Sequence, residues 1–278
     1  MNNYEKLEGM VAATFTPLDE NGDVNLSVID KYADWIASTP IKGVFVCGTT
    51  GEFSSLTIDE RKLILEKWLV SARKRFKVIA HVGSNCQRSA MELARHAAQV
   101  GADAIASIAP SFFKPGTVDE LVDFFAPICH SAAGLPFYYY NMPSITGVNL
   151  PVDKFLVEGK KKIPNLVGTK FTHNNLMEMG VCIELEQHRF EVLHGYDEIL
   201  ISGLAMGAVA GVGSTYNYIP NVYQAIFDSM KMNDLETARH NQIKSIRTVE
   251  VIIKYGGGVR GGKAIMKLIG IDCGSCRL

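Results

Sequence analysis

The sequence carries almost no net charge, which narrows the partners that it can have. Its 278 residues include 28 lysine and arginine residues and 29 aspartate and glutamate residues, so the formal net charge is −1 at pH 7. No block of like charge is longer than the three lysines at residues 160–162. Such a chain has no general field that attracts nucleic acid or an acidic membrane surface. We therefore expect neither nucleic acid nor a membrane among its partners.

Long apolar runs are also missing. No stretch approaches the ~18 apolar residues of a membrane-spanning helix. The first residues, MNNYEKLEGMVAATF, lack the basic region and apolar core of a secretory signal. With 47% hydrophobic and 21% charged residues, the composition is that of an ordinary globular protein. These features predict a cytoplasmic protein.

Cysteine is sparse and scattered along the chain. Of the six cysteines, only Cys273 and Cys276 have a spacing found in metal or redox sites, and no second pair of zinc ligands accompanies them. None of the seven histidines stands in an HExxH motif, and His81, within an apolar run, is expected to be a packed core residue. We predict no metal and no organic cofactor, and we interpret the CGSC segment as reduced thiols.

Short apolar runs alternate with longer segments of helical periodicity. Two of the helical segments open with the pattern of a capping box, Thr57-x-x-Glu60 and Thr117-x-x-Glu120. The eight expected strands are residues 10–16, 43–48, 77–83, 104–110, 136–141, 166–171, 190–195 and 210–214. Strands that alternate with helices form a parallel sheet, because each parallel connection needs a crossover. Eight such units without a linker predict a closed (β/α)₈ TIM barrel of the α/β class.

The last part of the chain does not continue this alternation. It has one long amphipathic segment, a glycine-rich break and a second helical segment. We therefore expect a barrel over residues 1–232 and a C-terminal helical extension over residues 233–278.

Polar residues gather where the expected strands end, and in such barrels the loops after the strands form the active site. They are GTTGE at 48–52, Tyr140, Lys170, GYDE at 195–198 and GST at 213–215.

Lys170 is the second-last residue of the buried run LVGTKF, where an ammonium group without a partner is costly. A lysine in water is almost wholly protonated near pH 7, and only a desolvated, neutral amine attacks a ketone to form a Schiff base. Tyr140, on the neighbouring strand at the same height, could carry protons for that reaction. The alternatives are a Lys170 that points outward or pairs with a carboxylate, and a Tyr140 that only packs.

The other loops offer binding groups. GTTGE has two hydroxyls and a tight backbone turn that suit a carboxylate. Asp197 and Glu198 could accept hydrogen bonds from a polyhydroxylated substrate, or they could simply cap the helix that follows. The glycine-rich segment at 207–214 could be a phosphate cradle, but no basic residue occurs between Ile199 and Pro220.

These motifs resemble those of a known family. GTTGE, YYNMPSITG (139–147), GTKFT (168–172), GYDE and GSTYN (213–217), in this order, are similar to the N-acetylneuraminate lyase branch of the dihydrodipicolinate synthase superfamily. The resemblance implies a class I aldolase on a (β/α)₈ barrel, usually a homotetramer, that reversibly cleaves N-acetylneuraminate to N-acetylmannosamine and pyruvate.

The resemblance also implies roles for individual residues. Lys170 would form the Schiff base and Tyr140 would transfer protons, while Thr49 and Thr50 would hold the pyruvate carboxylate. The groups that would hold the sugar hydroxyls are Thr172, Gly195, Asp197, Glu198 and Ser214.

Some positions distinguish the branches of the superfamily. Ile145 stands where the synthases carry an arginine for their second substrate, and Ser111, Phe112 and Phe113 stand where they carry a tyrosine. Phe45 stands where some lyases have a tyrosine. Two other functions stay open: a pyruvate aldolase or hydratase that acts on another 2-keto-3-deoxy sugar acid, and a non-catalytic barrel that binds a sugar acid.

Overall fold

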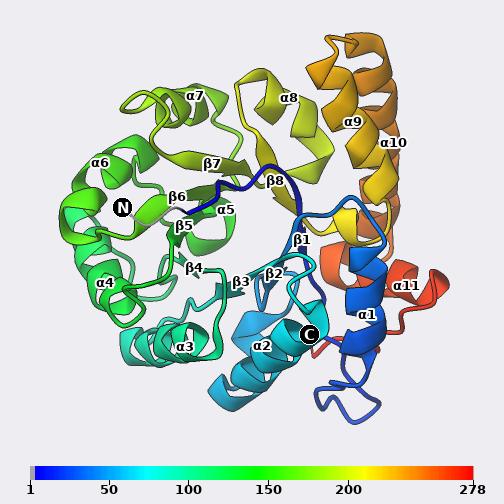
Figure 1. Ribbon diagram of the computed structural model, residues 1–278, viewed down its shortest axis with the longest axis horizontal. Coiled ribbons are helices and arrows are strands. Elements are labelled where there is room, and N and C mark those ends of the chain that lie inside the picture. Colours follow the sequence, from blue (N-terminus) through cyan, green and yellow to red (C-terminus); the bar gives the residue numbers. More distant parts are fainter. Residues whose placement is uncertain (1–3, 278) are drawn as a thin grey trace.

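The computed structural model describes residues 4–277 and forms a closed barrel of eight parallel strands, each paired with the next and β8 with β1 (Figure 1). This confirms the predicted (β/α)₈ fold. The strands are β1 Gly9–Ala13, β2 Gly43–Val46, β3 Lys77–His81, β4 Ala104–Ile108, β5 Phe137–Asn141, β6 Leu166–Phe171, β7 Glu191–His194 and β8 Ala210–Gly213.

Helices surround the barrel and cover the outer faces of the strands (Figure 1). They are α1 Val28–Ala37, α2 Ile58–Ala72, α3 Gln87–Val100, α4 Val118–His130, α5 Pro143–Thr146, α6 Val152–Lys162, α7 Leu176–Glu184, α8 Leu200–Ala205, α9 Pro220–Lys231, α10 Leu235–Lys254 and α11 Gly257–Leu268. Short 3₁₀ turns cover Phe53–Ser55, Asp197–Ile199 and Thr215–Asn217. In the described part of the chain, no helix is long and apolar enough to cross a membrane.

The two predicted capping boxes behave differently. At the start of α2, Thr57 Oγ1 accepts a hydrogen bond from the N–H of Glu60, and Glu60 Oε2 accepts one from the N–H of Thr57, at 3.2 and 2.7 Å. At the start of α4, Thr117 Oγ1 likewise accepts from the N–H of Glu120, but the Glu120 carboxylate binds the N–H of Gly116. The second box is therefore only half formed.

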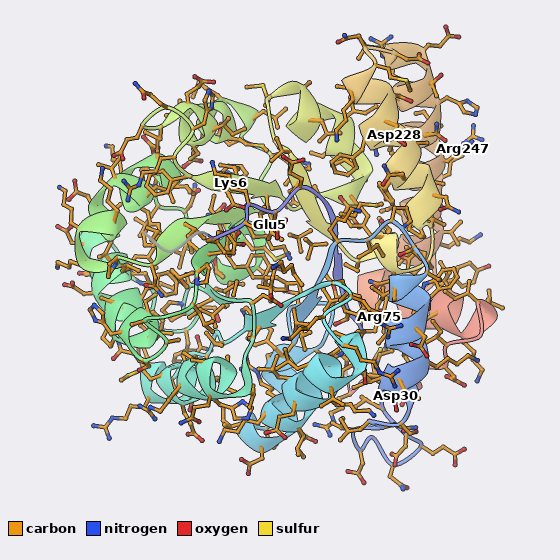
Figure 2. All side chains as sticks on the ribbon, viewed as in Figure 1. Glu5, Lys6, Asp30, Arg75, Asp228 and Arg247 are labelled. Atoms are coloured by element: carbon orange, nitrogen blue, oxygen red, sulfur yellow. The ribbon has the colours of Figure 1, made fainter. Side chains whose placement is uncertain are left out.

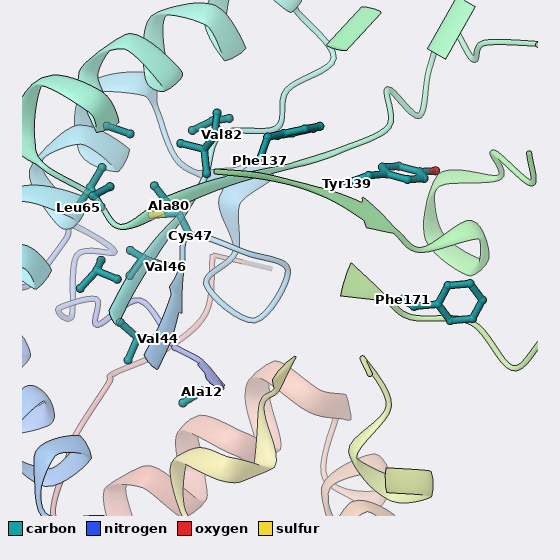
Figure 3. Close-up of a cluster of buried hydrophobic side chains, with 14 of the residues drawn as sticks. Ala12, Val44, Val46, Cys47, Leu65, Ala80, Val82, Phe137, Tyr139 and Phe171 are labelled. Atoms are coloured by element: carbon teal, nitrogen blue, oxygen red, sulfur yellow. The ribbon is translucent and has the colours of Figure 1, made fainter. Parts of the chain in front are cut away.

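Alternation along each strand divides the core into two layers. Tyr139 and Phe171 point outward into the large layer between strands and helices, part of which is drawn in Figure 3. Tyr138 and Tyr140 belong to the smaller cluster inside the barrel. Because side chains alternate along a strand, the residue before Phe171 points inward. This residue is Lys170, so the alternation directs its side chain into the barrel.

Ion pairs fasten the outer helices to one another at the surface. Lys67 of α2 pairs with Asp30 of α1 at 2.6 Å, and Arg75, just beyond α2, pairs with Asp34 at 2.8 Å. Asp30 and Arg75 are labelled in Figure 2 on this side of the molecule. These partly exposed pairs add little to stability individually.

The C-terminal helices pack beside the barrel. α10 lies along α9, and α11 continues from it after a glycine-rich turn near the C-terminal end of the chain (Figure 1). The segment after α11 returns to the loop that follows β1, where the N–H of Leu18 donates to the carbonyl of Cys273 at 3.1 Å. Cys273 is buried, Cys276 is partly buried, and neither forms a disulfide.

Candidate active site

Lys170 and Tyr140 lie opposite each other on β6 and β5 at the end of the barrel where the strands finish. Both are almost fully buried, with 4% and 2% of their surfaces exposed. Nζ of Lys170 lies 4.0 Å from the centre of the Tyr140 ring and 4.5 Å from that of Phe45. Among the described residues, no carboxylate is within 4.0 Å of this amine. The alternatives in which Lys170 points outward or forms an ion pair are therefore wrong.

The hydroxyl of Tyr140 is held by two neighbours. It lies 3.2 Å from Oγ1 of Thr49 and donates to Sδ of Met142 at 3.1 Å. Thr49 belongs to the loop after β2, so this contact joins GTTGE to the lysine–tyrosine pair. Sequence reasoning missed Met142, although the residue lies within the quoted YYNMPSITG motif.

An aromatic floor lies beneath the pair. The Phe45 ring centre is 5.6 Å from that of Tyr140, and the His81 ring centre is 5.8 Å from both. His81 is buried, as predicted, and its Nδ1 lies 2.8 Å from the carbonyl oxygen of Cys47. Burial, together with the nearby charge of Arg61, holds the pKa of His81 well below its ordinary value. The imidazole is therefore neutral beside the Lys170 amine.

The GTTGE loop forms a tight turn at the mouth. The N–H of Glu52 donates to the carbonyl of Thr49 at 3.0 Å, and Glu52 has a left-handed backbone with φ of 56°. The carbonyl of Gly51 accepts from the hydroxyl of Thr16 at 2.7 Å. Thr49 and Thr50 remain half-buried at the surface of the mouth.

On the other side of the mouth, Thr172 and Gly195 fit closely together. Oγ1 of Thr172 is buried and has no hydrogen-bond partner. A Cβ atom at position 195 would lie 2.0 Å from this oxygen, so only glycine leaves room for the hydroxyl. An unsatisfied buried hydroxyl is costly, and a ligand hydroxyl reaching it would supply the missing bond.

Asp197 joins two loops of the mouth. Its Oδ2 accepts hydrogen bonds from the N–H and the hydroxyl of Thr215, at 2.8 and 2.6 Å. A Cβ atom at Gly213 would lie 1.9 Å from its Oδ1. Burial raises the pKa of Asp197, an effect opposed by its bonds to Thr215 and by the charge of Lys170. One carboxylate oxygen is thus used to connect β7 to β8, which the sequence did not reveal.

Glu198 and Ser214 are less buried than Asp197. Glu198 is half-buried, and burial raises its pKa. Ser214 is half-buried at the end of β8. The segment after β7 forms a 3₁₀ turn at Asp197–Ile199 and then α8. Asp197 bonds to Thr215 across the mouth. The alternative interpretation, in which Asp197 caps the helix that follows it, is therefore wrong.

A phosphate cradle after β8 is disfavoured. The N–H of Thr215 already donates to Asp197, and no basic residue occurs between Ile199 and Pro220, so a phosphate there would meet a carboxylate. Fold and site therefore define a closed barrel of eight parallel strands with a buried lysine and a buried tyrosine side by side on adjacent strands at its mouth.

The comparisons with known proteins define the family. The model of the dihydrodipicolinate synthetase family matches residues 6–278, and the chain belongs to this family.

Named relatives in this family are N-acetylneuraminate lyases. The lyase of Mus musculus is 43% identical over 278 residues, covering 99% of this chain and 87% of the mouse protein. That of Gallus gallus is 43% identical over 282 residues, with coverage of 100% and 92%. The solved sialic acid aldolase of Aliivibrio salmonicida superposes with a TM-score of 0.96 at 38% identity, covering 99% of this chain and 91% of its own.

Proposed function

We propose that this protein is a Schiff-base aldolase that reversibly cleaves N-acetylneuraminate to N-acetylmannosamine and pyruvate. The observation that carries the proposal is the buried amine of Lys170, which lies beside Tyr140 with no counter-ion in the described residues. Relatives that match nearly the whole chain are lyases of this substrate.

The reaction follows from the two side chains. The neutral Lys170 amine adds to the C2 carbonyl of the open-chain sugar acid, and Tyr140 gives its proton to the departing C2 hydroxyl as the iminium forms. The resulting phenolate takes the proton of the C4 hydroxyl, the C3–C4 bond breaks, and its electrons enter the iminium as an enamine. Protonation at C3 and hydrolysis release pyruvate and regenerate the amine. The iminium itself is the electron sink, so the proposal includes no metal and no organic cofactor.

The binding roles are also proposals. The hydroxyls of Thr49 and Thr50 bind the carboxylate next to the carbon that Lys170 attacks. The remaining groups hold the hydroxyls of the sugar chain and lie across the mouth; they are Thr172, Gly195, Asp197, Glu198 and Ser214. The unsatisfied Thr172 hydroxyl supports this side as the sugar side.

We further propose that the protein works in the cytoplasm, in carbohydrate metabolism, as a homotetramer. Exposed apolar side chains favour association: Phe112 and Phe113 near the mouth are 77% and 86% exposed, and Ile253 on α10 is 67% exposed. Exposed apolar groups of this size are typical of contact surfaces between subunits. Sedimentation velocity would measure the number of subunits.

The first experiment is to trap the Schiff base. The protein is incubated with pyruvate and borohydride, digested, and analysed by mass spectrometry for a reduced adduct. We expect the adduct on Lys170 and none in the Lys170→Ala variant. Unmodified protein, with a known lyase labelled in parallel, would reject the aldolase and favour a barrel that only binds sugar acids.

Product analysis then tests the substrate. We expect faster pyruvate release from N-acetylneuraminate than from shorter 2-keto-3-deoxy sugar acids, because Asp197 and Glu198 offer acceptors for the longer chain. The reverse preference would assign the protein to a related aldolase or hydratase.

A further inference from the structure

A buried ion pair lies behind the GTTGE loop, outside the lysine–tyrosine site. Nζ of Lys263, on α11, is 2.7 Å from Oε1 of Glu52. Only 2% and 1% of these two side chains are exposed. Among the described residues, the other ion pairs are at least a fifth exposed on one partner. Burying an ion pair rarely adds net stability, so its place here needs another explanation.

The same two side chains hold the segment that follows α11. Nζ of Lys263 donates to the carbonyl of Ser275 at 2.6 Å, and Oε2 of Glu52 accepts from the N–H of Arg277 at 2.9 Å. The Arg277 guanidinium continues to the Ser55 carbonyl at 2.8 Å and to the Glu60 carboxylate. The C-terminal extension therefore packs against the GTTGE loop and the start of α2.

Contacts lead from this pair to the reacting groups. The left-handed backbone of Glu52 closes the turn by donating its N–H to the carbonyl of Thr49. The hydroxyl of Thr49 is 3.2 Å from that of Tyr140. A change in the position of the Glu52 side chain would therefore shift Thr49, which we assign to the substrate carboxylate.

The charges of Glu52 and Lys263 could also act on the substrate carboxylate directly. A lone carboxylate behind this loop would repel an incoming substrate carboxylate, and a lone ammonium would attract it. Because Lys263 and Glu52 cancel each other, the pair contributes geometry rather than net charge.

We propose that Glu52 and Lys263 are positioning residues that hold Thr49 and Thr50 in the arrangement that binds the carboxylate of the keto acid. The C-terminal extension thereby contributes to substrate affinity through its contacts with the GTTGE loop. This inference rests on the proposed Schiff-base function.

The test compares two ketones that react with the same amine. Borohydride trapping on Lys170 is measured as a function of pyruvate concentration, and separately with acetone, which has no carboxylate. For Glu52→Gln and Lys263→Met we expect the half-saturating pyruvate concentration to rise by about tenfold or more, which corresponds to about 1.4 kcal/mol. The rate of labelling by acetone should stay within about twofold of the unmodified protein, because the amine itself is undisturbed.

Two further variants serve as controls. Lys267→Met, one helical turn further along α11, removes an exposed ion pair with Asp272 and should leave both labelling reactions unchanged. Lys263→Arg keeps the charge and should recover part of the pyruvate affinity lost in Lys263→Met. If Lys263→Met does not fold, Glu52→Gln decides the question, since it preserves the shape of the side chain.

Each other outcome overturns the inference. A parallel loss of labelling by pyruvate and acetone would show a general structural role. Opposite changes in pyruvate affinity for Glu52→Gln and Lys263→Met would show an electrostatic role. Unchanged affinity in both would show that the pair is unimportant for binding. If unmodified protein is labelled by neither ketone, the Schiff-base function itself is wrong.

Discussion

Each end of the barrel interior holds a buried ionisable side chain beside a tyrosine, but the two side chains differ in their hydrogen bonds. At the mouth, Tyr140 lies beside Lys170; two residues earlier on β5, Tyr138 lies beside Glu191. The Glu191 carboxylate accepts hydrogen bonds from the Tyr138 hydroxyl at 3.0 Å and from the N–H of Leu7 at 2.9 Å. The Lys170 amine lies 4.0 Å from the centre of the Tyr140 ring and 4.5 Å from that of Phe45, and among the described residues it has no ion pair. A buried ionisable group with its bonds satisfied is structural, whereas one left without them is available for reaction.

The N-terminal segment explains part of this difference. Residues 4–8 run across the end of the barrel opposite the mouth (Figure 1), and the hydroxyl of Tyr4 bonds to that of Tyr138. This segment supplies one of the two donors to Glu191, the N–H of Leu7, and it closes that end. At the mouth, the loops leave the lysine amine accessible to a ketone.

The largest expected effect comes from removing the reactive amine. Lys170→Met should reduce turnover by at least about 10⁴-fold, since the Schiff base cannot form. Its free energy of unfolding should rise by about 1 kcal/mol, because a buried polar amine is replaced by an apolar chain of similar volume. Turnover assays and urea unfolding measure the two quantities. An active, folded variant would refute the role of Lys170.

The second largest effect is expected from removal of the Tyr140 hydroxyl. Tyr140→Phe should lower kcat by about 10²–10⁴-fold, because proton transfer to the C2 and C4 oxygens loses its group. The aromatic face against Lys170 is retained, so borohydride should still trap pyruvate on the lysine, more slowly. Steady-state kinetics and trapping separate these steps. A kcat within about twofold of the unmodified enzyme would exclude Tyr140 as the proton carrier.

A tyrosine-to-phenylalanine substitution at residue 138 should change the stability of the protein and leave its turnover unchanged. Tyr138→Phe leaves Glu191 with one donor fewer and Tyr4 without its partner, so the free energy of unfolding should fall by about 1–3 kcal/mol. Turnover should not change, because Tyr138 lies at the closed end. Urea unfolding at pH 7 measures the loss. A large drop in kcat would mean that the two ends are not independent.

The mouth side of this contrast could be predicted from the sequence, because it depends on alternation along strands and on the common direction of parallel strands. LVGTKF and FYYYN each end at the mouth, which placed Lys170 and Tyr140 together. Contacts between distant side chains could not be predicted in this way. The bond of Asp197 to Thr215, the Tyr140 contact with Met142 and the Glu52–Lys263 pair depend on how loops and the C-terminal helices pack after the barrel has closed.

The smallest expected effect is the pH dependence at the closed end. Burial raises the pKa of Glu191 above its ordinary value of 4.5. A carboxyl group with a raised folded-state pKa adds stability that is fully present below pH 4.5 and is lost as the pH rises through the folded value. Glu191→Gln does not titrate, so its stability relative to the unmodified protein should increase from pH 4 to pH 7. Urea unfolding of both proteins across this range measures the difference. A relative stability that falls with pH would mean that the hydrogen bonds from Tyr138 and Leu7 outweigh burial, and that the carboxylate form is the one this end of the barrel stabilises.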